Sequence, residues 1–224
     1  MTDIELLCQR AKAASRKMAN LDSKVKSKVL RSMAKALVDN CSYIIGENVK
    51  DVENAIKNNM PKALIDRLVL DEKRIKAMAY SLAEISKLKD PVGRILETRS
   101  RPNALLIKKV RVPIGVILVI YESRPNVTSD CVGLSLKSGN CVILRGGSDA
   151  INSNAAIFDI LNKEAMKFEI PEGAITMIKD TDRSIVNTLL VQKDLIDLVI
   201  PRGGESLIRE VADHSKIPVM KHYK

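Results

Sequence analysis

The sequence predicts an α/β protein in which a Rossmann-like parallel sheet is flanked by helices. Apolar, β-branched runs at 116–121 and 141–145 each end abruptly in polar, turn-forming residues, and a helix-length segment joins them. Shorter apolar runs at 175–178 and 197–200 continue the alternation of strand and helix. This alternation is typical of parallel strands joined by right-handed crossovers. In such sheets ligands bind where loops leave the carboxyl ends of the strands.

Residues 1–97 are predicted to form amphipathic helices that precede the sheet. Apolar residues recur there at helical spacing in several stretches, each with a charged back. The stretches begin near Ile4, Asp22, Asn40, Pro61 and Asp71. Because a striped helix must bury its apolar face, we expect these helices to be scaffold and not to carry the site.

Residues 98–112 change character and indicate two short extended runs around a Pro102-Asn103 turn. A basic hairpin without a helix to cover it would project from the body. Edge strands pair readily with other chains, so one interpretation is contact with another subunit. Simple surface decoration is the other, and the residues alone favour neither.

Residues 113–224 form the predicted Rossmann-like part. Between its strands we expect helices at about 129–137, 149–168 and 182–191, and a further helix after the last strand. No internal repeat, low-complexity tract or flexible linker interrupts this part.

Two loops share the form strand, arginine, two glycines, polar residue, helix. They are Arg145-Gly146-Gly147-Ser148 and Arg202-Gly203-Gly204-Glu205-Ser206. Glycine lets the backbone approach a ligand closely, the free N–H groups of the next helix favour an anion, and arginine adds positive charge. One such turn is more often a packing feature, but two at neighbouring strand tips favour a nucleotide phosphate site. Neither loop matches the standard Rossmann or P-loop pattern.

The loop Glu122-Ser123-Arg124-Pro125-Asn126 is the other candidate for chemistry. Pro125 restricts the backbone before Asn126, whose amide could donate to an oxygen that gains negative charge. The simpler interpretation is that Asn126 and Thr128 turn the chain and cap the next helix. The residues alone favour this simpler interpretation.

The composition, 46% hydrophobic and 29% charged, is ordinary for a soluble globular protein. No apolar run approaches the roughly 20 residues that span a bilayer, and the N-terminus lacks a signal-peptide core, so we expect a cytoplasmic protein without a membrane partner. The net charge of +10 raises the question of nucleic acid. Because the excess is scattered over residues 1–112, and 3% aromatic residues without Trp leave few stacking platforms, we expect no nucleic-acid partner.

The cysteines Cys8, Cys41, Cys131 and Cys141 are widely spaced among apolar neighbours. No CxxC pair or Cys/His cluster suggests a metal site, so we expect no metal and buried, reduced thiols.

Four stretches resemble the gamma-glutamyl phosphate reductases (glutamate-5-semialdehyde dehydrogenases), a family within the aldehyde dehydrogenase superfamily. They are PIGVILVIYESRPNVT, LKSGNCVILRGGSDAINSNAAI, DLVIPRGGESLI and SKIPVMKHYK. The resemblance covers essentially the whole chain and implies an aldehyde dehydrogenase-type cofactor-binding domain. It implies NADPH-dependent reduction of L-glutamyl 5-phosphate, an acyl phosphate, to L-glutamate 5-semialdehyde in proline biosynthesis. It also implies a homo-oligomer joined through residues 98–112, and glutamate 5-kinase is a candidate partner.

The resemblance assigns roles to the loop residues position by position. Asn126 matches the oxyanion-hole asparagine, and Arg145 matches the basic residue that reaches the adenosine ribose of the cofactor. Ser148 falls where NAD-preferring relatives carry a glutamate, and a hydroxyl there avoids repelling the 2′-phosphate of NADP.

The remaining loop residues receive binding roles in the same way. Gly203, Gly204, Glu205 and Ser206 match the loop over the cofactor pyrophosphate. We assign Gly146, Gly147 and Arg202 to cofactor binding with them. Glu122, Ser123 and Arg124 are assigned to the substrate.

In the resembling family a cysteine attacks the acyl phosphate, and the resulting acyl-cysteine thioester accepts hydride. That cysteine lies beyond the match to SKIPVMKHYK, and none of the four cysteines here occupies its position. We therefore expect the catalytic-cysteine domain to be absent from this chain and the chain to be inactive alone. The alternative is a non-catalytic nucleotide-binding or assembly module.

Overall fold

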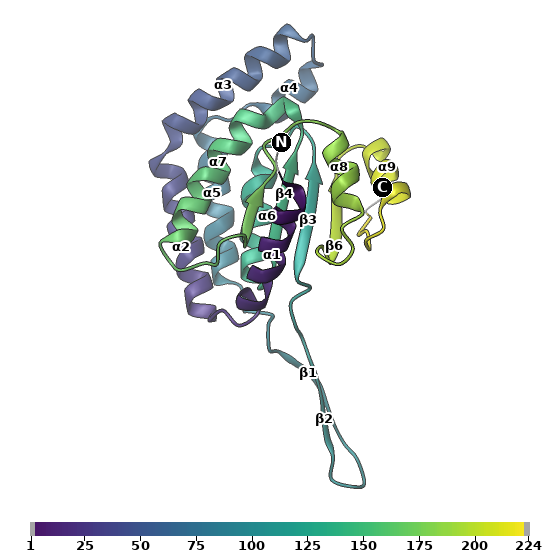
Figure 1. Ribbon diagram of the computed structural model, residues 1–224. Coiled ribbons are helices and arrows are strands. Elements are labelled where there is room, and N and C mark those ends of the chain that lie inside the picture. The colour runs from purple at the N-terminus through teal and green to yellow at the C-terminus, as the bar shows by residue number, and fades with distance from the viewer. Residues whose placement is uncertain (1–2, 222–224) are drawn as a thin grey trace.

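The structure, a computed structural model that describes residues 3–221, is built around a four-stranded parallel sheet with the order β5-β4-β3-β6 (Figure 1). The strands are β3 (Val116–Tyr121), β4 (Cys141–Gly146), β5 (Ile175–Met177) and β6 (Leu198–Arg202). Every residue of β3 and β4 is buried, which accounts for their continuous apolar runs, because parallel sheets are covered on both faces. The predicted fold class is confirmed.

The helices between the strands cover both faces of the sheet. They are α6 (Asn126–Lys137), α7 (Ile151–Met166) and α8 (Ser184–Leu190), with a 3-10 helix η1 (Ser148–Ala150) in front of α7, while α9 (Glu205–His214) follows the last strand. The predicted helix at 149–168 is therefore two elements. After β5 the chain passes back beyond β4 and adds β6 on the far side of β3. Figure 1 shows α8 and α9 grouped beside β6.

The predicted N-terminal helices are all present in the described residues. They are α1 (Ile4–Met18), α2 (Ser23–Asp39), α3 (Cys41–Lys57), α4 (Lys62–Leu68) and α5 (Glu72–Lys87). The side chains of Asp3, Asp22 and Asp71 start three of them by accepting backbone N–H groups. α1 packs on β3, β4 and β5, while α2, α3 and α5 form an outer layer against α6 and α7. One hydrophobic core runs through α1, α2, α3, α5 and the sheet, and a separate small cluster packs α4 against α3.

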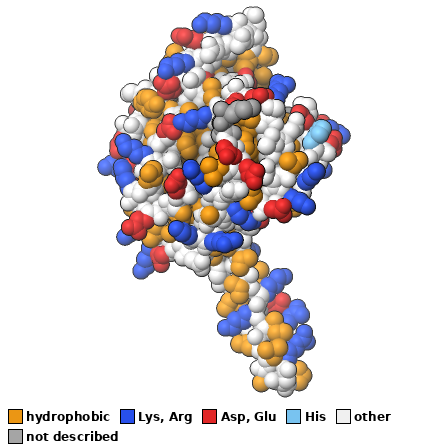
Figure 2. Space-filling model, viewed as in Figure 1, with side chains coloured by type: hydrophobic (Ala, Val, Ile, Leu, Met, Phe, Trp, Pro, Cys, Tyr) orange, Lys and Arg blue, Asp and Glu red, His pale blue; other side chains and the backbone are white. Residues whose placement is uncertain are grey.

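The strands β1 (Ile95–Ser100) and β2 (Leu106–Val110) form an antiparallel hairpin that projects from the body (Figure 1). Every residue of both strands is exposed, and the surface mixes apolar and basic side chains (Figure 2). The hairpin begins before the predicted residue 98. Pairing continues to Ile95 across a register irregularity between Ile95 and Glu97 that no turn residue marks.

Buried lysines fasten the root of the hairpin. Lys26 of α2 donates to Asp90 Oδ2 at 3.0 Å, and Asp90 Oδ1 accepts the N–H of Val92 at 2.9 Å, where the chain turns into the hairpin. Lys137, the last residue of α6, donates to the carbonyl of Ser86 at 2.9 Å. Charged groups remain buried only when they have such partners, so this cluster fixes where the hairpin leaves the body.

The segment after α9 returns to the sheet. The N–H of Val199 in β6 donates to the carbonyl of Pro218, and the N–H of Met220 donates to the carbonyl of Val199, both at 2.9 Å. Residues 218–220 therefore lie parallel to β6 along its outer side.

Candidate functional site

Three loops leave the same edge of the sheet because their strands run in parallel. Tyr121 at the end of β3 pairs with Gly146 on one side and with Arg202 on the other. The prediction that the arginine–diglycine loops lie on neighbouring strands is thus wrong. The two loops flank β3 at a separation of roughly 10 Å, which is two strand spacings. Strand order reverses between β3 and β6, which is where open α/β sheets bind ligands. We call residues 122–126, 145–149 and 202–206 the loop edge.

A carboxylate of the chain itself occupies the start of α9. Glu122 Oε2 accepts the N–H of Gly204 at 2.9 Å. A Cβ atom added at position 203 would lie 2.4 Å from the same oxygen, so this approach requires Gly203. A helix N-terminus presents unpaired N–H groups and a partial positive charge, which stabilise a carboxylate. Glu122, which we assigned to the substrate, is therefore directed toward the predicted pyrophosphate loop.

Arg145 belongs to the loop edge but is buried. Its guanidinium donates to the carbonyls of Gly146 at 3.0 Å and Thr181 at 2.9 Å, which holds the loop before α8 against β4. Burial lowers the pKa of Arg145, and nearby Arg183 acts in the same direction, but an arginine keeps its charge at neutral pH. Its Nε is buried and has no hydrogen-bond partner in the described structure. The contact with a cofactor ribose stays a prediction.

The loop after β4 turns toward α3. Ser148 and Asp149 begin η1 and line a cavity of about 470 Å³ together with residues of α3, among them Asp51. Asp51 accepts the N–H and the hydroxyl of Ser153 at 2.8 and 2.6 Å, which fixes the start of α7. No residue of 202–206 lines this cavity, so Ser148 is not brought together with the β6 loop there.

A side-chain hydrogen bond ties the loop after β3 to the loop after β4. The buried Ser123 donates its hydroxyl to Asp149 Oδ2 at 3.1 Å. Ser123 has a φ of 27°, a left-handed conformation that a non-glycine residue keeps only when its surroundings impose it. Arg124, the next residue, is exposed. Asp149 is not among the predicted site residues. The sequence signal that could have identified it is an acidic residue directly after the RGGS turn.

Asn126 is the first residue of α6, which begins before the predicted residue 129. Pro125 already has helical angles, φ −60° and ψ −29°, and a proline suits the first turn because its missing N–H would have no helical partner. Asn126 is exposed, and its Nδ2 donates to Asp130 Oδ2 at 3.1 Å. No side chain caps α6, so the capping interpretation of Asn126 and Thr128 is wrong.

A buried polar chain lies beneath the loop edge and explains Thr128. Its hydroxyl shares a hydrogen bond with the Tyr121 hydroxyl at 2.7 Å and donates to Asn154 Oδ1 at 3.1 Å. Burial raises the pKa of Tyr121, so the phenol stays protonated. Gly146 closes over this chain, because a Cβ atom there would lie 2.4 Å from Asn154 Nδ2. Gly146 therefore also has a packing role between β4, α6 and α7.

The sequence model of the aldehyde dehydrogenase family matches residues 1–223. The chain belongs to the aldehyde dehydrogenase family. It is 57% identical over 219 residues to the gamma-glutamyl phosphate reductase of Caldanaerobacter subterraneus subsp. tengcongensis, which covers 98% of this chain and 53% of that protein. Crystal structures of gamma-glutamyl phosphate reductases from Thermotoga maritima and Saccharomyces cerevisiae are also similar.

The Thermotoga maritima structure has a TM-score of 0.96 and 40% identity over 98% of this chain and 53% of its own. The Saccharomyces cerevisiae structure has a TM-score of 0.93 and 31% identity over 100% of this chain and 57% of its own. The chain therefore spans about half the length of the curated relatives that it matches. The predicted resemblance is confirmed.

Three of the cysteines of this aldehyde dehydrogenase chain, Cys8, Cys131 and Cys141, are poorly suited to nucleophilic attack. Burial raises the pKa of Cys8 to about 11 and the pKa values of Cys131 and Cys141 to about 12. Because the thiolate is the reactive form, these thiols are almost wholly unreactive at neutral pH. Cys131 is the cysteine nearest the loop edge in sequence, and it lies within α6.

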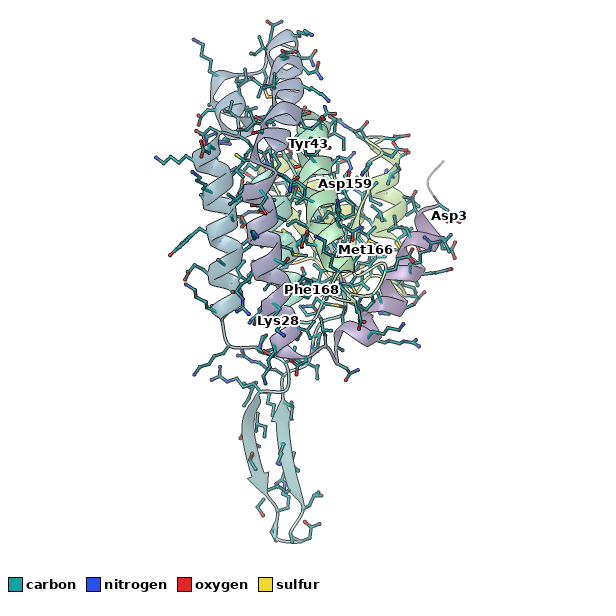
Figure 3. The ribbon with its side chains drawn as sticks, turned by 90° about the vertical axis from the view of Figure 1, so that its left-hand side faces the viewer. Asp3, Lys28, Tyr43, Asp159, Met166 and Phe168 are labelled. Atoms are coloured by element: carbon teal, nitrogen blue, oxygen red, sulfur yellow. The ribbon has the colours of Figure 1, made fainter. Side chains whose placement is uncertain are left out.

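Other features of this aldehyde dehydrogenase chain lie apart from the loop edge. A cavity of about 540 Å³ lies between α1 and α7, and both Asp3 and Met166 line it. Figure 3 shows Met166 on the side of α7 that faces α1, and Asp3 at the start of α1. None of the predicted site residues lines it. Within residues 3–221 no group of three His, Cys, Asp or Glu side chains could hold a metal ion. No helix in that range is both long and apolar enough to cross a bilayer.

Proposed function

We propose that this chain is the nucleotide-binding portion of a cytoplasmic, NADPH-dependent reductase that converts L-glutamyl 5-phosphate to L-glutamate 5-semialdehyde in proline biosynthesis. The observation that carries the proposal is the exit of three polar loops from one edge of the sheet, two of them at the point where strand order reverses, in a chain 57% identical to a gamma-glutamyl phosphate reductase. Glutamate 5-kinase, which would supply the acyl phosphate, is the partner that this activity implies.

The diglycine turn before α9 fits a cofactor phosphate. Gly203 allows an anionic group to approach the backbone more closely than a Cβ atom would permit, and the N–H of Gly204 donates to a carboxylate, that of Glu122, where a phosphate oxygen could bind instead. When bound, NADPH supplies the hydride for the reduction. We assign the pyrophosphate to Gly203, Gly204, Glu205 and Ser206, with Arg202 beside them. Gly147 and the Arg145 Nε would bind the adenosine ribose of the cofactor. Ser148 carries no charge there and would not repel a 2′-phosphate.

The loop after β3 faces the acyl group in this proposal. Asn126 would release Asp130 and donate its amide hydrogen to the carbonyl oxygen as negative charge develops there. The exposed Arg124 would attract the phosphate of the substrate, and Ser123 would hold the loop in place through Asp149.

The nucleophile of the acyl-cysteine step is not Cys8, Cys131 or Cys141 in this proposal, because their thiols stay protonated at neutral pH. We expect residues 1–224 alone to bind nucleotide without reducing acyl phosphate.

Titration of the chain with NADPH and with NADH, followed by nucleotide fluorescence, tests the binding part of this proposal. We expect saturable binding with NADPH held more tightly, and no oxidation of NADPH when acyl phosphate is added. Absence of binding to either nucleotide would contradict the assignment, and turnover by the chain alone would contradict the assignment of the thiols.

A second function, assembly, is favoured by the projecting hairpin. We propose that residues 98–112 pair with another subunit, because apolar side chains on both strands of the hairpin are exposed. Isolated two-stranded hairpins are only marginally stable in water, so a partner would also stabilise this one.

A further inference from the structure

The contact between Glu122 and Gly204 joins two loops that the proposed function assigns to different ligands. The two residues are 82 positions apart, and the carboxylate reaches across the reversal point from the end of β3 to the start of α9. The N–H of Glu122 also donates to the carbonyl of Arg202 at 3.2 Å, which brings its backbone beside the β6 loop.

The carboxylate accepts the N–H that the proposed function assigns to a phosphate oxygen. Both are anionic acceptors, and a backbone N–H of a helix N-terminus stabilises either one. The donor at Gly204 is a single hydrogen, and the space beside Gly203 is filled by the carboxylate, whose oxygen and carbon would lie 2.4 and 2.6 Å from an added Cβ atom. A phosphate bound there would also be repelled by the carboxylate charge.

We propose that Glu122 is an internal competitor for the phosphate-binding turn and sets the affinity of this chain for dinucleotide. The inference rests on the proposed function, since the competing anion is the cofactor pyrophosphate. The carboxylate caps α9 when nucleotide is absent and rotates into solvent when nucleotide binds. Glu122 is thus an affinity-determining residue that does not contact the reacting atoms.

The neighbouring residues allow this rotation without movement of the backbone. The Glu122 residue is exposed, and its side chain is held in the described structure by the Gly204 contact alone. The next residue, Ser123, is buried and bonded to Asp149, so the loop itself stays fixed.

The test compares the wild-type chain with Glu122→Ala, Glu122→Gln and the control Glu210→Gln by NADPH titration and thermal unfolding without nucleotide. Glu122→Ala is expected to bind NADPH roughly 3- to 10-fold more tightly, the size of one exposed carboxylate contact at a helix N-terminus. Its melting temperature without nucleotide is expected to fall, because α9 loses its cap. Glu122→Gln keeps a neutral acceptor, so its NADPH affinity and melting temperature should lie between those of the wild type and Glu122→Ala.

Glu210→Gln removes the same charge from the later part of α9 and should leave NADPH affinity unchanged. Tighter binding together with lower stability supports the proposal, because damage to the fold alone would weaken both. Equal or weaker binding by Glu122→Ala, or equal tightening by Glu210→Gln, overturns it while the proposed function stands. If neither the wild type nor any variant binds NADPH, the inference and the proposed function fail together.

Discussion

Asn126 shows how a helix start can present a polar group without using it as a cap. Its amide lies at the exposed beginning of α6 and donates to Asp130, whose other oxygen accepts the hydroxyl of Ser81 at 3.1 Å. Asp130 therefore orients the amide from within the same helix. This arrangement favours an Asn126 amide that can exchange Asp130 for another hydrogen-bond acceptor.

Replacement of Asn126 by Ala in the complete reductase should lower kcat by roughly 100-fold, the usual effect of removing one oxyanion donor. The affinity for NADPH should change little, because the side-chain hydrogen bond of Asn126 is to Asp130 in its own helix and not to the β6 loop. Steady-state kinetics and nucleotide titration of the same variant provide the measurement. Equal losses in kcat and NADPH affinity would refute the role that we propose for this amide.

Among the elements, the hairpin depends on the buried cluster at its root. Burial raises the pKa of Asp90, but the N–H of Val92 and the Lys26 ammonium outweigh it and lower the pKa overall. A carboxyl group with a lowered folded-state pKa contributes stability above its unfolded value, here an ordinary 3.8. That contribution disappears as the pH falls through the lowered value.

Asp90→Asn should therefore lower the free energy of unfolding at pH 7 by about 3 kcal/mol, because it leaves the buried Lys26 without its counter-charge. The variant should also lose part of the acid-dependent decline in stability. Urea unfolding at pH 7 and at successively lower pH values measures both effects. Glu97→Gln, which breaks an exposed pair with Arg99, is the control and should change little. An unaltered acid profile in Asp90→Asn would exclude this role for Asp90.

The strands of the hairpin carry a prediction of their own. Leu106→Asp should shift the chain toward smaller assemblies, because a charge would replace apolar surface that we assign to a subunit contact. Its folding stability should stay within about 0.5 kcal/mol, since the side chain is exposed. Sedimentation velocity measures the assembly, with Val38→Asp on α2 as the control. An unchanged distribution of species would argue against assembly through 98–112.

At the scale of the whole molecule, the sequence was sufficient to predict the elements but not their order in space. Continuous apolar runs predicted β3 and β4 because both faces of a parallel sheet are covered. The same runs carry no information about neighbours, so the position of β3 between the two arginine–diglycine loops was missed.

The loop residues were predicted by type and not by partner. Glycine and arginine at strand ends indicated an anion site, and the structure brings 122–126 and 202–206 together. That the anion at Gly204 is Glu122 depends on a side-chain rotamer and a contact across 82 positions. No local pattern encodes either. The burial of Arg145 was missed for the same reason, since its carbonyl partner at Thr181 lies in a distant loop.

The return of residues 218–220 to β6 has a consequence for handling the protein. An exposed edge strand can pair with the edge strand of another copy and so lead to aggregation. Residues 218–220 cover the edge that β6 would otherwise expose. Met220→Pro removes the N–H that bonds to Val199 and should make solutions scatter more light on storage than Met220→Ala does. If both variants stay equally clear, the shielding comes from elsewhere in the molecule.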